Sequence, residues 1–372
     1  ALFWMEIAAL FGMATKYSEG LLAIKYRTTD KHGHILGGPF YYIENGMGKK
    51  WTWLAKIFAF FGMGVGLFGI GTFTQVNGIT SAVGNFFDPN AQNVIHLLGR
   101  DYTLAVVISG LILTVCVGLV VIGGLKRIAK VSEIIVPFMA VIYIAISLLL
   151  LILNANKIPA AIVEIVSSAF GMRAAAGGAL GAIIVAMQKG IARGIFSNEA
   201  GLGSAPIAAA AAQTKEPVRQ GLVSMTGTFI DTIVICSCTA MIMLLVPQDQ
   251  IEGLAGMELL QTAMRYHLGE AGVIFIAVML FLFSFSTFLG ILFYARCNVA
   301  YLFGDKWCWQ TAYKVLALVM LFIGGIATYT FVWDLGDVGI GLMTIFNIFM
   351  LYPLGEKALK ELKIYEAEKK KK

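Results

Sequence analysis

About nine long stretches of mostly apolar residues run through this 372-residue chain, each long enough to cross a lipid bilayer as a helix. Their approximate bounds are 1–24, 55–82, 103–123, 131–153, 175–193, 219–246, 271–303, 311–330 and 334–352. Hydrophobic residues make up 58% of the chain and charged residues 13%, against roughly a quarter charged in soluble domains. The sequence therefore predicts an all-α protein that crosses the membrane many times, and it excludes a soluble multidomain enzyme.

The basic residues between these stretches are divided unevenly between the two sides of the membrane. If successive connections alternate between the sides, 20 of the 28 Lys and Arg fall on one side and four on the other. Basic residues favour the cytoplasmic side. We therefore expect residues 1–372 to form a single transmembrane domain in the cell inner (plasma) membrane, with a cytoplasmic tail over about 355–372.

The chain opens inside its first apolar stretch, without a start methionine, a charged leader segment or a small-residue cleavage site. We expect at least one membrane span to precede Ala1. An odd number of helices also fits poorly with the paired repeats on which many transporter folds are built.

Four motifs along the chain carry a family resemblance. They are Ala1–Glu6 (ALFWME), Gly12–Tyr17 (GMATKY), Gly37–Glu44 (GGPFYYIE) and Ser197–Pro206 (SNEAGLGSAP). On these motifs the chain resembles the alanine or glycine:cation symporter family, the sodium/alanine symporters, over essentially its whole length. The resemblance implies a LeuT-like inverted-repeat transporter that lacks its first core helix in this chain. It also implies sodium-coupled symport of small neutral amino acids, as L or D isomers, by alternating access.

Polar residues at mid-membrane depth are the candidates for the amino-acid site, because such sites are built where transmembrane helices break. The second stretch places Thr72 and Gln75 one turn apart, with Phe68 a further turn away. Gln75 either binds the substrate or bonds a neighbouring helix, and Phe68 either walls a small apolar pocket or packs in the core. The resemblance makes the fifth stretch the second broken helix, where Met187 and Gln188 are further substrate candidates.

Two residue pairs inside the apolar stretches have structural interpretations. Gly62 and Gly66 form a GxxxG pair, which lets two membrane helices approach closely. Lys16 and Glu19 lie three positions apart, a spacing that places opposite charges on one helix face and predicts an ion pair. We assign no chemistry to Arg193, whose long side chain can reach the membrane surface from the end of its stretch.

Hydroxyl oxygens in the seventh stretch are the candidates for a sodium site, since sodium prefers hard oxygen ligands. Ser286 and Thr287 match the hydroxyl pair that the resemblance implies for sodium, although each can instead bond a backbone carbonyl one turn back. Asp231, with Thr228 on the same helix face, lies near the middle of the sixth stretch, where an unpaired carboxylate costs at least ~2.5 kcal/mol. Asp231 has three interpretations: a cation ligand, a proton-titrating group, or a structural acceptor of hydrogen bonds from hydroxyls and backbone of a neighbouring helix.

The Ser197–Pro206 motif is the clearest family marker, and we place it on the cytoplasmic side. Ser197, Asn198 and Glu199 have the composition of a helix N-cap, and Gly201 permits backbone rearrangement. We therefore expect a gate or hinge in this motif rather than a binding site.

The sequence contains no metal-ligand cluster, no phosphate-binding motif and no nucleotide domain. We predict no enzyme activity, no cofactor and no metal beyond sodium as the coupling ion. The expected partners are the amino acid, sodium and the lipid bilayer, with no nucleic acid and no obligate protein partner. The alternatives to sodium coupling are a proton-coupled amino-acid permease and, less favoured, a passive channel, for which no filter motif is found.

Overall fold

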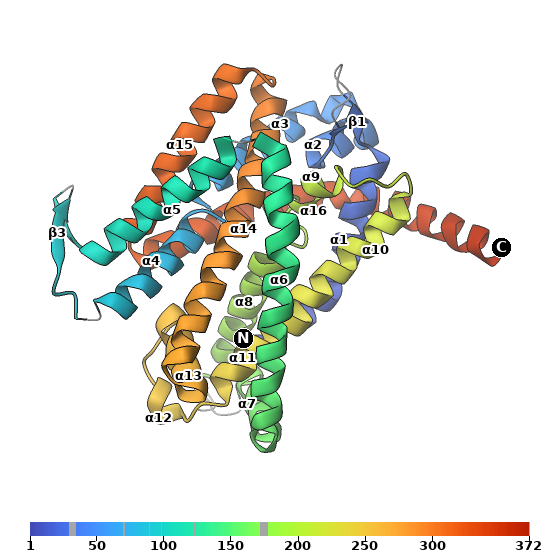
Figure 1. Ribbon diagram of the computed structural model, residues 1–372. Coiled ribbons are helices and arrows are strands. Elements are labelled where there is room, and N and C mark those ends of the chain that lie inside the picture. Colours follow the sequence, from blue (N-terminus) through green and yellow to red (C-terminus); the bar gives the residue numbers. More distant parts are fainter. Residues whose placement is uncertain are drawn as a thin grey trace.

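The computed structural model describes residues 1–29, 35–69, 71–88, 90–97, 99–122, 124–171 and 178–371. Helices dominate these residues, and two antiparallel hairpins supply their strands (Figure 1). The strands are β1 (Thr28–Thr29), β2 (Ile35–Leu36), β3 (Val94–Leu97) and β4 (Arg100–Thr103), with β1 paired to β2 and β3 to β4.

Most of the described residues lie in α-helices. In chain order these are α1 (Leu2–Lys25), α2 (Pro39–Tyr42), α3 (Thr52–Phe68), α4 (Phe73–Phe87), α5 (Leu104–Ile122), α6 (Gly124–Leu153), α7 (Ile158–Ala169), α8 (Ala179–Asn198), α9 (Ala205–Ala209), α10 (Pro217–Thr228), α11 (Ser237–Leu244), α12 (Gln248–Ile251), α13 (Gly256–Leu268), α14 (Glu270–Phe303), α15 (Trp307–Ile326) and α16 (Tyr329–Lys370). Two π-helical segments, η1 (Ile43–Met47) and η4 (Phe229–Cys236), and two 3-10 segments, η2 (Lys49–Trp51) and η3 (Ala155–Lys157), complete the set.

The predicted membrane stretches are mostly helical in their described parts. Eight helical segments of the described chain are long and apolar enough to cross a membrane, and α1 covers the first predicted stretch with 24 residues. Helices α5 and α14 each begin and end within one residue of the predicted bounds. The prediction of an all-α, multi-pass membrane protein is therefore confirmed.

Large apolar side chains remain exposed along several of these helices. Leu119 on α5, Val141 on α6 and Ile345 on α16 are each more than half exposed. Contact of such side chains with water is unfavourable, whereas the hydrocarbon core of a bilayer accommodates them. These helix faces are therefore suited to contact lipid.

Six of the connecting elements fall into two groups in space, and β3 lies apart from both at the left (Figure 1). In Figure 1, β1, α2 and α9 gather at the upper right, whereas α7, α12 and α13 lie at the bottom. The first group comes from connections assigned to the basic side and the second from connections assigned to the other side. The positions of these six elements thus agree with connections that alternate between two sides.

The second predicted stretch is not one continuous helix. It is divided into α3, which ends at Phe68, and α4, which begins at Phe73. Gly71 between them has a φ of 79°, a conformation that favours glycine. A Cβ atom at Gly71 would also overlap the side chain of Ile291. Hydropathy alone does not locate this break, because an apolar, Gly-rich run satisfies the hydropathy criterion whether or not the backbone breaks.

The C-terminal tail is helical rather than a separate segment. Helix α16 continues through Pro353 to Lys370, and Ala358 is fully buried. The Lys25 ammonium on α1 lies 2.6 Å from the Glu361 carboxylate. Residues beyond 355 are therefore packed, at least in part, against the body of the protein.

The GxxxG pair of α3 packs as predicted. A Cβ atom at Gly62 would lie 2.7 Å from the Asn298 side chain of α14. At Gly66 it would lie 2.5 Å from both the Ala295 Cβ and the Tyr313 hydroxyl. Helix α3 thus approaches α14 and α15 at distances that a side chain would prevent.

The substitution Gly66→Ala is expected to lower the free energy of unfolding by about 1–3 kcal/mol, because the added methyl group overpacks this contact. Thermal unfolding of the purified protein in detergent measures the change. Gly64→Ala is the matched control on the same helix, since its Cβ would meet nothing closer than a Phe68 ring carbon at 3.8 Å. Equal melting temperatures for the two variants would contradict the prediction.

Candidate functional site

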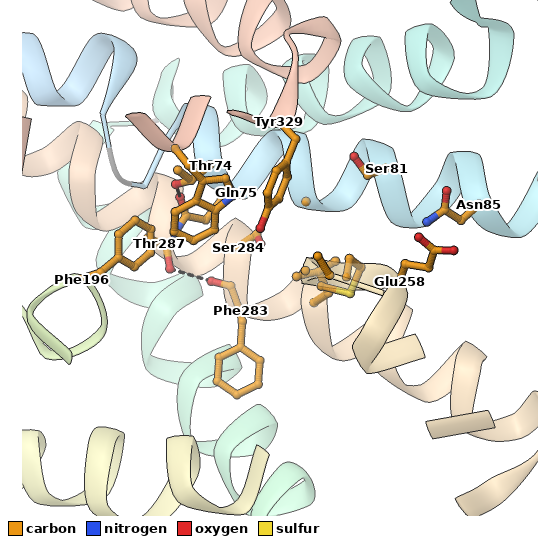
Figure 2. A pocket seen from close by; sticks show the side chains of 16 residues that line it. Thr74, Gln75, Ser81, Asn85, Phe196, Glu258, Phe283, Ser284, Thr287 and Tyr329 are labelled. Carbon is orange, nitrogen blue, oxygen red and sulfur yellow. Dashed lines mark hydrogen bonds between the residues drawn. The ribbon is translucent and has the colours of Figure 1, made fainter. Parts of the chain in front are cut away.

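A cavity of about 530 Å³ lies among α4, α8, α13, α14 and α16. Its polar lining residues are Thr74, Gln75, Ser81, Asn85, Glu258, Ser284 and Thr287. Figure 2 shows Gln75 and Thr287 beside Phe196 at one end of this group, and Asn85 and Glu258 at the other. A concave site with a few polar groups among apolar and aromatic side chains is the usual form of a small-molecule site.

Gln75 lies just beyond the break between α3 and α4. Its Oε1 atom accepts a hydrogen bond from the Gly71 N–H at 2.6 Å and another from the Thr74 hydroxyl. This oxygen therefore satisfies a backbone N–H that the break leaves without a helical partner. The Nε2 atom has no acceptor among the described residues, so it can donate to the carboxylate of a ligand in the cavity.

The hydroxyl groups of α14 lie on two faces of the helix. Ser284 and Thr287, three positions apart, line the cavity, whereas the Ser286 hydroxyl lies 3.8 Å from the Met139 sulfur of α6. Ser286 and Thr287 both donate to the carbonyl of Phe283, each at 2.8 Å (Figure 2 shows the Thr287 bond). The backbone bonding considered as an alternative is thus present. These bonds also bring three hard oxygen atoms together, the two hydroxyl oxygens and the Phe283 carbonyl oxygen.

Sequence reasoning missed Ser284. It was visible as a third hydroxyl in the same polar run, and its i, i+3 spacing from Thr287 places the two on one helix face. Ser284 is also buried, with 3% of its surface exposed. A helical wheel of this run places Ser284 and Thr287 on one face of the helix and Ser286 on a different face.

The other predicted substrate residues lie outside the lining of the cavity. Thr72 is fully buried and donates to the Gly69 carbonyl at 3.2 Å, so it stabilises the break. Phe68 packs edge to face against an aromatic ring of α4. On α8, Met187 is half-buried and Gln188 is exposed. The structure therefore brings together Gln75 and Thr287 from the predicted set and leaves these four apart.

Asp231 lies in the π-helical segment η4, and such segments frequently occur at functional sites. Its Oδ2 atom accepts hydrogen bonds from the Ser197 hydroxyl at 2.7 Å and from the Thr232 hydroxyl at 3.0 Å. Asn198 donates to Thr232 at 2.9 Å. The buried Thr228 hydroxyl has no partner among the described residues. Asp231 thus joins η4 to the end of α8.

The Ser197–Pro206 motif forms a second interruption. Ser197 and Asn198 end α8 instead of capping a following helix, because α9 begins only after an irregular segment. The predicted N-cap is therefore wrong. Glu199 and Gly201 in this segment have φ values of 54° and 83°. Much of the segment is buried, so it is not a solvent-exposed loop.

Glu19 of α1 holds this irregular segment from inside the protein. Its carboxylate accepts hydrogen bonds from the N–H groups of Gly203 at 3.1 Å and Gly201 at 3.4 Å, and from Asn347 of α16 at 2.6 Å. Glu19 and Lys16 are both buried and interact electrostatically, as their spacing predicts. Lys16 also interacts with the carboxylate in η4.

Tyr42 of α2 completes this network. Burial and the nearby Glu19 carboxylate raise the pKa of Tyr42 well above its usual value, so the phenol stays protonated. It donates a hydrogen bond to Asn347, which in turn donates to the Gly201 carbonyl at 2.9 Å. Helices α1, α2 and α16 therefore meet at the interruption between α8 and α9.

Arg193 has a partner that sequence reasoning did not identify. Its guanidinium group makes two bonds to the Asp337 carboxylate of α16, with Nη2–Oδ2 at 2.9 Å and Nη1–Oδ1 at 3.1 Å. It also lies over the Trp333 ring, 4.2 Å from the ring centroid. A usable signal was present, since Asp337 is an acid within the last apolar stretch.

Within the described chain, no three or more His, Cys, Asp and Glu residues are grouped so that they could hold a metal ion. Hydroxyl and carbonyl oxygens, which are hard ligands of the kind that sodium prefers, come together at Phe283, and hydroxyl and carboxylate oxygens come together at Asp231.

Comparison with known proteins extends over the whole chain. A model of the sodium:alanine symporter family matches residues 1–372. An uncharacterized transporter of Haemophilus influenzae is 45% identical over 367 residues, covering 98% of this chain and 76% of the relative. The sodium/alanine symporter AgcS of Methanococcus maripaludis is 40% identical over 379 residues, covering 100% and 78%. The probable sodium/glutamine symporter GlnT of Bacillus subtilis is 38% identical over 371 residues, covering 100% and 73%.

Proposed function

Because this chain belongs to the sodium:alanine symporter family, whose members are transporters and not enzymes, we propose that it couples import of a small neutral amino acid to the inflow of sodium. Alanine and glycine are the proposed substrates, as L or D isomers. We place this multi-pass protein in the cell inner membrane with its C-terminus cytoplasmic. A LeuT-like arrangement and alternating access are part of the same proposal.

The observation that carries this proposal is the cavity between the break at Gly71 and the middle of α14. The free Nε2 donor of Gln75 is suited to the carboxylate of an amino acid. The neighbouring aromatic side chains are suited to a short apolar side chain. The broken helix beside the site frees backbone polar groups, and the side chains of Gln75 and Thr72 bond the Gly71 N–H and the Gly69 carbonyl among them.

Sodium is proposed to bind at Thr287 and Ser286, beside the Phe283 carbonyl. A hydroxyl that donates one hydrogen bond keeps lone pairs for a cation. If sodium raises the affinity for the amino acid, the amino acid must raise the affinity for sodium by the same factor. This reciprocity lets the sodium gradient drive accumulation of the substrate.

A proton-coupled permease is the alternative, and its titrating group would be Asp231 in its network with Ser197. Under that alternative Thr287 carries no coupling ion. Glutamine is a second substrate to test, because one relative is named for it. A passive channel, the third alternative, would let alanine equilibrate without accumulation under any ion gradient.

The substitution Thr287→Ala is expected to abolish sodium-driven uptake of labelled alanine into proteoliposomes, because it removes a proposed sodium ligand. Thr287→Ser keeps the hydroxyl and should retain most of the uptake. The matched control is Thr114→Ala on α5, which removes a hydroxyl with the same backbone bond at 2.8 Å outside the cavity. The assay applies an inward sodium gradient and then an inward proton gradient.

Each outcome separates the alternatives. Uptake that follows sodium and is lost only in Thr287→Ala supports the proposal. Uptake driven by protons alone, and untouched by Thr287→Ala, would move the coupling ion to Asp231. If no ion gradient accumulates alanine while glutamine accumulates, the substrate part of the proposal is wrong and the coupling part is tested with glutamine.

A further inference from the structure

An aromatic wall, formed by Phe196 of α8 and by Tyr329 and Trp333 of α16, lines part of the cavity. The Phe196 and Trp333 ring centroids lie 4.8 Å apart with the planes tilted by 34°, and the Tyr329 and Trp333 centroids lie 5.9 Å apart. Figure 2 shows Phe196 and Tyr329 beside Gln75 and Thr287. The wall is therefore part of the proposed binding site.

The Arg193–Asp337 ion pair lies directly against this wall. The guanidinium carbon is 4.2 Å from the centroid of the Trp333 ring and 5.8 Å from that of Phe196. Trp333 precedes Asp337 by one helical turn, and Phe196 follows Arg193 by three residues, so each charge shares a helix face with a ring. One guanidinium group thus contacts both rings while it bonds the carboxylate.

We propose that Arg193 and Asp337 are positioning residues that latch the aromatic wall closed, and that the pair must separate during each transport cycle. The inference rests on the proposed function for its transport step, because a cavity that serves alternating access must open and close. The planar, two-bond geometry fixes the relative position of α8 and α16 in a way that a single lysine contact would not.

The exposure of the pair suits a latch that opens. The Arg193 and Asp337 side chains are 31% and 34% exposed, so the rest of the protein does not fully enclose either charge. A deeply buried pair would resist opening, because an unpaired buried charge is strongly unfavourable. Helices α8 and α16 contact each other over a short stretch of the described residues, which lets the ion pair determine their spacing.

The first test measures access to the cavity past the aromatic wall, and it does not require transport. Ser284→Cys in a background lacking the five native cysteines places a thiol in the cavity, and its labelling rate by a water-soluble maleimide reports access. Arg193→Ala and Asp337→Asn are expected to raise that rate by about tenfold, because the open state is a minor population while the latch holds. The charge-swapped double variant, Arg193→Asp with Asp337→Arg, should return the rate toward that of the parent.

The control is Arg296→Ala, which removes an ion pair with Asp305 that does not line the cavity. It should leave the labelling rate unchanged. Size-exclusion chromatography of every variant separates a latch effect from misfolding, and Asp337→Asn keeps the side-chain volume in case Arg193→Ala fails to fold. Parent-like labelling in both folded single variants would overturn the proposal, as would failure of a folded charge swap to slow labelling.

The second test asks whether the pair opens during transport. Cysteines replacing Arg193 and Asp337 are joined with a cleavable bis-maleimide, and alanine uptake is measured before and after cleavage. Inhibition that cleavage reverses supports the latch, whereas full uptake with the crosslink in place would overturn it. If the uncrosslinked parent takes up no alanine, the proposed function has failed, and the labelling experiment still decides the latch.

Discussion

Replacing Glu19 with leucine is expected to destabilise the protein severely, with a loss of about 3–5 kcal/mol in the free energy of unfolding. The change leaves the buried Lys16 ammonium without its nearest acid on α1. It also removes the acceptor used by the Gly201 and Gly203 N–H groups and by Asn347. Buried donors that lose their acceptor bear the full cost of desolvation.

Thermal unfolding and the yield of monodisperse protein measure this loss. Glu270→Leu is the matched control, because Glu270 makes an exposed ion pair with Arg265 that contributes at most about 1 kcal/mol. Glu19→Gln should fall between the two, since its amide keeps one acceptor oxygen but carries no charge to balance Lys16. If Glu19→Leu melts together with Glu270→Leu, the network around Glu19 does not hold the interruption between α8 and α9.

Gln75→Leu is expected to lower the kcat/KM of alanine uptake by about 10-fold to 100-fold. The variant loses the hydrogen bond to the carboxylate of the substrate, and it leaves the Gly71 N–H without an acceptor. Gln75→Glu separates the loss of the substrate contact from the loss of the backbone acceptor. A carboxylate still accepts from the Gly71 N–H and the Thr74 hydroxyl, so the break keeps its hydrogen bonds. The carboxylate introduced by Gln75→Glu cannot donate a hydrogen bond to the carboxylate of the substrate, and the two negative charges repel each other.

Uptake should therefore be lost in Gln75→Glu although the protein unfolds at the parent temperature. Uptake near the parent level in Gln75→Glu would show that Gln75 only stabilises the break. Gln188→Leu serves as the control, because this glutamine is exposed on α8 and lies outside the cavity lining. A larger loss in Gln188→Leu than in Gln75→Leu would place the amino acid against α8 instead.

The membrane-spanning helices were predictable because a bilayer imposes one requirement, an apolar run of sufficient length, that can be read without knowing any neighbour. The interruptions were not predictable, because they are defined by backbone dihedral angles: Gly71 lies within a run of uniform hydropathy, and the segment after Asn198 lies between two predicted stretches. Hydropathy therefore located the helices but not the points at which the backbone is interrupted.

The site was predictable only where local spacing determined it. Gln75 and Thr287 were found as polar residues at membrane depth, and both line the cavity. The partners of Arg193 and Glu19 were missed because Asp337 and Asn347 lie on α16, far along the chain. Contacts of that kind depend on how helices pack, and a single sequence carries no direct record of it.

Helix α16 has a mechanical consequence. It runs for 42 residues, or about 63 Å at the rise of an α-helix, with Trp333 near one end, Asn347 midway and Glu361 near the other. If the helix moves as one body through Pro353, a tilt of about 10° around its midpoint moves each end by about 5 Å. A fluorophore attached near Glu361 would therefore report movement at the distant cavity. An antibody bound to that end would slow this movement.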